Sequence, residues 1–378
     1  MLQINQTYNV STAPRLVELD GLRGVAVGMV LIWHFVGAPL TSRDNFLFKA
    51  IHDVTILGRT GVDLFFVLSG FLIIGIILDR QQPAFRFLRH FYLRRVLRIV
   101  PSYLALVFLF WSAVYAGASN AVFNADTPLW RHLTFTQNIW MATHEQWGPG
   151  GISVTWSVAI EEQFYLVFPF VILFLPKRML LPMLALVAGA SIIYRSVGYF
   201  GYGSVFTMYV HTFSRLDGLA EGGVVAILWR DDRFREWLRR NLSGWTKAVG
   251  ILAFGFIPLV VGMSNNVAST TAAWGHTYLA LLYSALLIYI LGSLGSENLK
   301  YLRNEKLQKL GRISYTLYLV HPLMLSAIYI GGRQPEALHS FGAVPLSALA
   351  LVLSLWWSYV SFRFFEKPLT DWGRKWTY

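Results

Sequence analysis

An arginine and a histidine share one face of the first apolar stretch of the chain, residues 19–35. Arg23 and His34 are eleven residues apart, so on a helix they lie on one face, roughly 16 Å apart along the axis. Ionisable groups are costly inside a membrane and mark functional sites by default. The pair is therefore a candidate for chemistry. The structural alternative is a positive-inside anchor at Arg23 and a satisfied bundle histidine at His34.

Two acidic residues in later apolar stretches could serve this histidine. Asp63 lies near the start of the second stretch, and Glu161 lies about seven residues, or about 10 Å, into the fourth. If both stretches enter from the side toward which His34 lies, the three groups meet at a similar depth. A carboxylate beside an imidazole fixes its tautomer and raises its basicity, as the activation of a hydroxyl requires. A buried structural network is the alternative, and we expect only one of Glu161 and Glu162 to face the bundle interior.

A basic amphipathic segment follows the second apolar stretch, at residues 90–101. Within it, Arg95 and Arg98 are three residues apart, so on a helix they share a face. Guanidinium forks suit phosphate oxygens and stay charged when partly buried, whereas a lipid-headgroup anchor is the alternative reading of such a cluster. The sequence has no glycine-rich P-loop pattern, so a nucleoside triphosphatase has no support.

Other polar groups in apolar stretches have ordinary structural explanations. We expect Arg215 and Asp217 to form ion pairs with other helices, because residues two apart do not face each other. His321 precedes Pro322 and fits a polar group at a helix kink. No spacing indicates a metal site, and the absence of cysteine excludes disulfides and thiol catalysis.

Composition places these residues in a membrane. Of the 378 residues, 55% are hydrophobic and only 14% are charged, whereas soluble domains carry about 25% charge. The net charge of +12 could suggest nucleic acid, but in a membrane protein excess Lys and Arg belong in cytoplasmic loops. We therefore expect membrane lipids and no nucleic acid among the partners.

The expected fold is all-α, a polytopic bundle of about ten transmembrane helices that forms a single domain over residues 1–378. Glycines four apart, at Gly24 and Gly28 and at Gly218 and Gly222, predict close helix packing. A bilayer core requires about 20 apolar residues per span. By that length the predicted spans are 22–40, 61–79, 99–117, 154–175, 179–199, 205–229, 246–263, 271–294, 312–332 and 344–363.

Basic residues set the expected orientation. They are dense after the second, fourth, sixth and eighth spans, and the alternate loops carry few. This asymmetry places both termini in the cytoplasm. Arg23, Arg95 and Arg98 then lie at the cytoplasmic edge of the membrane, and His34 lies in the opposite half. The one long outer loop, 118–153, is a candidate lid or acceptor surface, or a plain connection. The few basic residues expected on the outer side are Arg43, Lys49, Arg59, Arg131 and Arg333.

Five motifs spread over essentially the whole chain resemble the acyltransferase-3 family of integral-membrane O-acyltransferases. Together they are specific, although each alone would be weak. They are Leu19-Asp-Gly-Leu-Arg-Gly with His34, Gly61-Val-Asp-Leu-Phe-Phe-Val-Leu-Ser-Gly, Arg95-x-x-Arg98, Trp156-Ser-Val followed by Glu161-Glu-Gln-Phe-Tyr, and Ser314-Tyr-Thr-Leu-Tyr-Leu-Val-His-Pro.

The resemblance implies transfer of an acyl group, usually acetyl from acetyl-CoA, to a hydroxyl of a cell-envelope carbohydrate or glycolipid. The family's Arg-x10-His pattern falls on Arg23 and His34, and its Arg-x-x-Arg pattern falls on Arg95 and Arg98. The chain resembles the stand-alone form that lacks a fused extracytoplasmic domain. A bacterial inner membrane is the expected location.

Residues and resemblance agree on a mechanism. Arg23, Arg95 and Arg98 would bind the phosphates of the acyl-CoA donor, without a metal. His34 would activate the acceptor hydroxyl or carry the acyl group transiently, and Glu161 or Asp63 would orient it. A transporter or flippase for a glycolipid or envelope precursor is the alternative, because intramembrane charges also fit that class.

Overall fold

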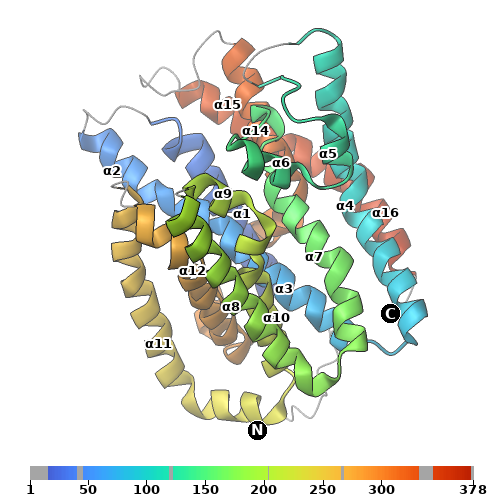
Figure 1. Ribbon diagram of the computed structural model, residues 1–378, viewed down its shortest axis with the longest axis vertical. Coiled ribbons are helices and arrows are strands. Elements are labelled where there is room, and N and C mark those ends of the chain that lie inside the picture. The colour runs from blue at the N-terminus through green and yellow to red at the C-terminus, as the bar shows by residue number, and fades with distance from the viewer. Residues whose placement is uncertain are drawn as a thin grey trace.

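The protein is described by a computed structural model that covers residues 16–40, 46–118, 122–202, 204–264, 268–331 and 344–375. All the regular elements in these ranges are helical, which confirms the predicted all-α class (Figure 1). The elements are α1 Val17–Ile32, η1 Trp33–Gly37, α2 Phe46–Thr55, η2 Ile56–Thr60, α3 Gly61–Leu78, α4 Ala84–Tyr115, α5 Leu129–Leu133, α6 Gln137–His144, η3 Gly150–Ile152, α7 Thr155–Phe174, α8 Lys177–Tyr202, α9 Val205–Val210, η4 Thr212–Ser214, α10 Leu216–Leu228, α11 Asp232–Ser264, α12 Ala268–Gly292, η5 Glu297–Leu299, α13 Glu305–Arg312, α14 Ser314–Gly331, α15 Val344–Ser361, η7 Phe362–Glu366 and α16 Lys367–Gly373.

Seven helical segments in the described ranges are long and apolar enough to cross a membrane, so the chain is an integral membrane protein with several candidate spans. Helices are suited to the apolar interior of a membrane because they satisfy their own backbone hydrogen bonds. The other three predicted spans, 205–229, 246–263 and 312–332, are not among these seven segments. In the first of these the helix breaks between α9 and α10, next to the charged Arg215 and Asp217. The seven segments are Val17–Gly37, Phe46–Leu78, Ala84–Tyr115, Thr155–Phe174, Lys177–Gly201, Ala272–Gly292 and Val344–Gly373.

Helix α3 forms the centre of the bundle. Its residues are apolar around the whole circumference and most of them are buried, as expected of a helix surrounded by other helices. It packs against α1, α7, α10 and α12. Two glycines allow the closest of these approaches. A Cβ on Gly70 would overlap the carbonyl of Leu219, and one on Gly222 would overlap the carbonyl of Val67. Backbones in direct contact therefore hold α3 and α10 together, as the Gly218 and Gly222 spacing predicted.

Helix α1 packs against the short basic helix α13 at one end of the bundle. A Cβ on Gly24 would overlap the carbonyl of Leu307, so close packing at this glycine is confirmed. Gly28 has open space where its Cβ would stand, so the expectation that it also admits a neighbouring helix is wrong. The α1–α13 contact places the turn of α1 that carries Arg23 beside this short basic helix.

The opposite end of the bundle carries most of the short helices. The described part of the long predicted loop, 122–153, contains α5, α6 and η3, and α6 packs against α7 and α9 (Figure 1). Helix α1 reaches this end through the π-helical turn η1, which contacts α2 and η2. His34 therefore lies under a covered end of the bundle, and Arg23 lies toward the other end.

Candidate functional site

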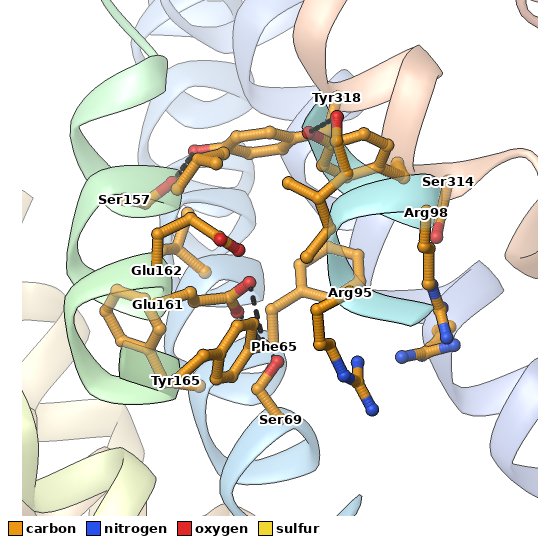
Figure 2. A pocket seen from close by; sticks show the side chains of 16 residues that line it. Phe65, Ser69, Arg95, Arg98, Ser157, Glu161, Glu162, Tyr165, Ser314 and Tyr318 are labelled. Atoms are coloured by element: carbon orange, nitrogen blue, oxygen red, sulfur yellow. Dashed lines mark hydrogen bonds between the residues drawn. The ribbon is translucent and has the colours of Figure 1, made fainter. Parts of the chain in front are cut away.

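A cavity lies between α1, α3, α4, α7 and α14 (Figure 2). The cavity brings together segments that are far apart in the sequence. Its lining residues are Arg23, Val62, Phe65, Phe66, Ser69, Arg95, Arg98, Ile99, Ser157, Val158, Glu161, Glu162, Tyr165, Ser314, Tyr315 and Tyr318.

Three arginines predicted to act together line this cavity. Arg23 comes from α1, and Arg95 and Arg98 come from one face of α4, as their spacing predicted. Arg98 is close enough to Arg23 for the two charges to repel. In the described part of the chain, none of the three donates a hydrogen bond to a carboxylate. Guanidinium groups gathered in this way are a candidate anion site, because a bound anion would relieve their repulsion.

Glu161 faces the arginines from α7. Its carboxylate accepts hydrogen bonds from Ser69 Oγ at 2.7 Å and from the hydroxyl of Tyr165 at 3.2 Å. The ring of Tyr165 also lies 5.5 Å from the guanidinium of Arg95. Glu162 lines the cavity too, so the expectation that only one of the two glutamates faces the interior is wrong. Their side chains come from neighbouring helical positions, about 100° apart, and both are directed toward the cavity (Figure 2).

His34 lies in the π-helical turn η1, a feature often found at functional sites. Its Nδ1–H donates to the carbonyl of Val30 at 2.9 Å, which leaves Nε2 as the basic nitrogen. The ring lies edge-on to His321, with centroids 4.7 Å apart. His321 likewise donates from Nδ1 to Leu317, and its buried Nε2 has no hydrogen-bond partner in the described chain. The structure thus places two imidazoles together, each with Nε2 uncommitted.

Tyr318 stands between the cavity and the two histidines. Its side chain lines the cavity, and its ring lies 5.8 Å from that of His321. Its hydroxyl is hydrogen-bonded to Ser157 Oγ at 2.7 Å and to the carbonyl of Val154 at 3.2 Å (Figure 2). His34 is not among the residues that line the cavity, and it reaches Tyr318 only through His321.

Asp63 has other partners. Its carboxylate accepts a hydrogen bond from Arg215 at 2.7 Å and one from His276 at 3.2 Å, and it is buried with them. Neither Asp63 nor Glu161 is hydrogen-bonded to His34, so the structure does not bring the predicted trio together. The expectation that Arg215 and Asp217 pair with other helices is confirmed, because Asp63 lies on α3 and Arg195, the partner of Asp217, lies on α8.

Sequence reasoning missed His321 and Tyr318 as neighbours of the predicted site. Both lie in the quoted motif Ser314–Pro322, but the histidine was explained as a group at a helix kink. Depth supplied a usable signal. His321 is about nine residues into span 312–332, and His34 is about twelve into span 22–40, so two spans of the same direction place both near the same level.

The sequence profile of the Acyl_transf_3 family, described as an acyltransferase domain, matches residues 16–363. That range contains every residue that lines the cavity and the two histidines beyond it. The chain belongs to the acyltransferase-3 family. This bears out the resemblance of its five motifs.

Curated bacterial relatives carry names that fit the family. A Staphylococcus aureus (strain COL) protein named as a candidate O-acetyltransferase, SACOL0978, is 27% identical over 94% of this chain. O-acetyltransferase OatA of Staphylococcus aureus strain NCTC 8325 is 26% identical over 96% of it. In both comparisons the matched region is 58% of the relative's length. No solved structure matches the chain.

Proposed function

We propose that this acyltransferase-3 member moves an acetyl group from acetyl-CoA to a hydroxyl of an extracytoplasmic or lipid-linked carbohydrate. The observation that carries the proposal is the convergence of Arg23, Arg95 and Arg98 on one cavity, where none of the three is hydrogen-bonded to a carboxylate of the described chain. A CoA ester presents phosphates to such a site, and guanidinium groups bind phosphates through charge-assisted hydrogen bonds. The names of the Staphylococcus aureus relatives support acetyl as the acyl group.

His34 performs the chemistry in this proposal. The acceptor hydroxyl attacks the thioester carbonyl, and Nε2 of His34 takes its proton. The carbon–sulfur bond then breaks, and the departing CoA thiolate receives the proton. Alternatively, His34 Nε2 attacks first and carries the acetyl group to the acceptor, with the same net balance. Either route requires the acetyl end of the donor to pass Tyr318.

The two predicted carboxylates have different parts in the proposal. Glu161 lines the cavity, so it can orient groups there and balance the charge of the arginines. Oδ1 of Asp63 accepts hydrogen bonds from both Arg215 and His276, and we propose that Asp63 positions Arg215 rather than acting on His34. Both assignments rest on the hydrogen bonds in which each carboxylate takes part.

Sidedness follows from the positions of these groups and from the basic loops. In the proposed orientation both termini are cytoplasmic and about ten spans cross the membrane. Arg23, Arg95 and Arg98 then lie toward the cytoplasm, where acetyl-CoA is made, and His34 lies toward the outer side. The acetyl group therefore crosses the membrane during transfer, in the bacterial inner membrane.

Acetyl transfer can be separated from transport by one assay. Purified protein is incubated with radiolabelled acetyl-CoA and an envelope extract, and the carbohydrate fraction is counted. We expect label in ester linkage, released by mild base, and none with a variant that lacks His34. Movement of an envelope precursor across vesicles without acetylation would instead support a transporter.

A further inference from the structure

Arg59 is a cation without an acid partner at the His34 end of the bundle. It lies in η2, and among the described residues it has no ion pair and no hydrogen bond to a carboxylate. Its guanidinium instead lies over two rings, 5.6 Å from the centroid of Trp33 and 5.2 Å from that of Tyr209. Partly buried charges are ordinarily paired, so an unpaired one with a fixed position is a candidate ligand site.

Packing fixes this guanidinium close to His34. A Cβ on the preceding residue, Gly58, would overlap the carbonyl of Met29, so the η2 backbone lies directly against α1. Trp33 is the neighbour of His34 in the π-helical turn, and the charge of Arg59 is close enough to act on His34. A group bound by Arg59 would therefore lie beside the imidazole.

The surroundings of Arg59 are aromatic and carry a net positive charge. Tyr209 also lies 5.2 Å from the guanidinium of Arg215, but Asp63 neutralises that arginine. Trp147 extends the aromatic surface. Its ring centroid is 5.8 Å from that of Tyr209, and 43% of the residue is exposed. The uncompensated charge of the cluster is thus that of Arg59.

We propose that Arg59, Trp33, Trp147 and Tyr209 bind the acceptor, and that this acceptor is a sugar bearing a carboxylate or phosphate group. Aromatic faces pack against the apolar faces of sugar rings, and a guanidinium fork holds an oxyanion in two hydrogen bonds. The assignment rests on the proposed function, because His34 supplies the reason for an acceptor to bind there. It adds the charge of the acceptor, which the transfer chemistry leaves open.

The test measures binding and needs no turnover. The protein is placed in nanodiscs of zwitterionic lipid, and coenzyme A saturates the arginine cavity so that sugar phosphates cannot bind there. Glucose, glucuronic acid and glucose 6-phosphate are then compared by saturation-transfer NMR. We expect at least one of the anionic sugars to bind more tightly than glucose, by on the order of 10-fold or more.

Variants assign the preference to one side chain. Arg59→Gln should abolish it, and Arg59→Lys should retain part of it because the charge remains without the fork. Arg131→Gln is the matched control, since Arg131 also lies over an aromatic ring, that of Trp130 at 4.1 Å, but outside this cluster. Unchanged coenzyme A binding in each variant shows that the bundle is intact.

Three results would overturn the proposal. The first is equal binding of the three sugars, and the second is a preference for anionic sugars that survives in Arg59→Gln. The third is displacement of the anionic sugars by an anionic phospholipid that the protein retains only when Arg59 is present. The last result would make the site a lipid-headgroup site. If the wild-type protein prefers anionic sugars but shows no acetyl transfer, the result counts against the proposed function alone.

Discussion

The imidazole of His34 has one nitrogen engaged by the backbone and one that is not. Because Nδ1–H donates to Val30, Nε2 is the nitrogen able to take a proton or an acetyl group. Replacing His34 with alanine should lower acetyl transfer by about 100-fold or more, the range expected for loss of a general base. The affinity for acetyl-CoA should stay near that of the wild type, since the arginines remain. Label transfer and equilibrium binding of radiolabelled acetyl-CoA measure the two effects.

His144→Ala is the control for this substitution. His144 is an exposed histidine that stacks on Trp140, so its loss should change neither measurement. Substantial turnover remaining in His34→Ala would remove His34 from the chemistry. A parallel loss of donor binding would make its role structural.

The arginines should affect the donor and not the chemistry. Arg95→Ala and Arg98→Ala each remove a charge-assisted contact worth about 1.5–3 kcal/mol, which corresponds to roughly 10- to 150-fold in the dissociation constant of acetyl-CoA. Arg89→Ala, an exposed arginine on the same helix α4, is the matched control and should bind normally. Unchanged donor affinity together with poor membrane insertion would favour the lipid-anchor reading of Arg95 and Arg98.

Local spacing predicted part of the site. The three-residue spacing of Arg95 and Arg98 was enough to place both on one face of α4, because a helix fixes that geometry. The depth of Glu161 along its span predicted that it lies inside the bundle. Depth does not determine which neighbouring helix the side chain of Asp63 faces. That choice depends on rotation about the helix axis, and Arg215 and His276 outcompete a distant imidazole for a carboxylate. The contact between His34 and His321 was missed because Pro322 offered a sufficient local explanation for His321, although the depths of the two histidines in their spans agree.

At the scale of elements, the contact between α3 and α10 is the most constrained one described above. A methyl group at Gly222 must displace the backbone of α3, which carries Ser69 and the apolar wall of the cavity. We expect Gly222→Ala to lower the free energy of unfolding by about 1–3 kcal/mol, the usual cost of overpacking. Thermal unfolding in detergent measures the change as a lowered midpoint.

Gly28→Ala provides the comparison, because a Cβ there meets open space. Alanine is the better helix former by about 1 kcal/mol, so this variant should be neutral or slightly stabilised. Equal destabilisation by the two substitutions would contradict the claim that contact between α3 and α10 governs the effect of Gly222→Ala.

Apolar length predicted the elements better than their breaks. Each of the seven segments long enough to span a membrane overlaps a predicted span, because a bilayer core requires about 20 apolar residues. The break between α9 and α10 depends on Arg215 and its tertiary partners, which a window of hydropathy does not contain. The π-helical turn at Trp33–Gly37 likewise contains no proline and no pair of glycines from which a change in helix type could be predicted.

For the whole molecule, the central claim is that donor and acceptor sites lie at opposite ends of one bundle. Arg23, Arg95 and Arg98 line a cavity that Tyr318 also lines, and the ring of Tyr318 contacts His321, which in turn contacts His34. With the orientation proposed from the basic loops, a donor from the cytoplasm must pass its acetyl group outward past Tyr318.

Sealed vesicles of known orientation test this claim most directly. Acetyl-CoA, which does not cross the membrane, is added outside vesicles that contain the acceptor inside. Inside-out vesicles, whose cytoplasmic face is exposed, should acetylate the enclosed acceptor, and right-side-out vesicles should not. Equal activity in both orientations, with vesicles shown to be intact, would contradict a donor site at the cytoplasmic end of the bundle.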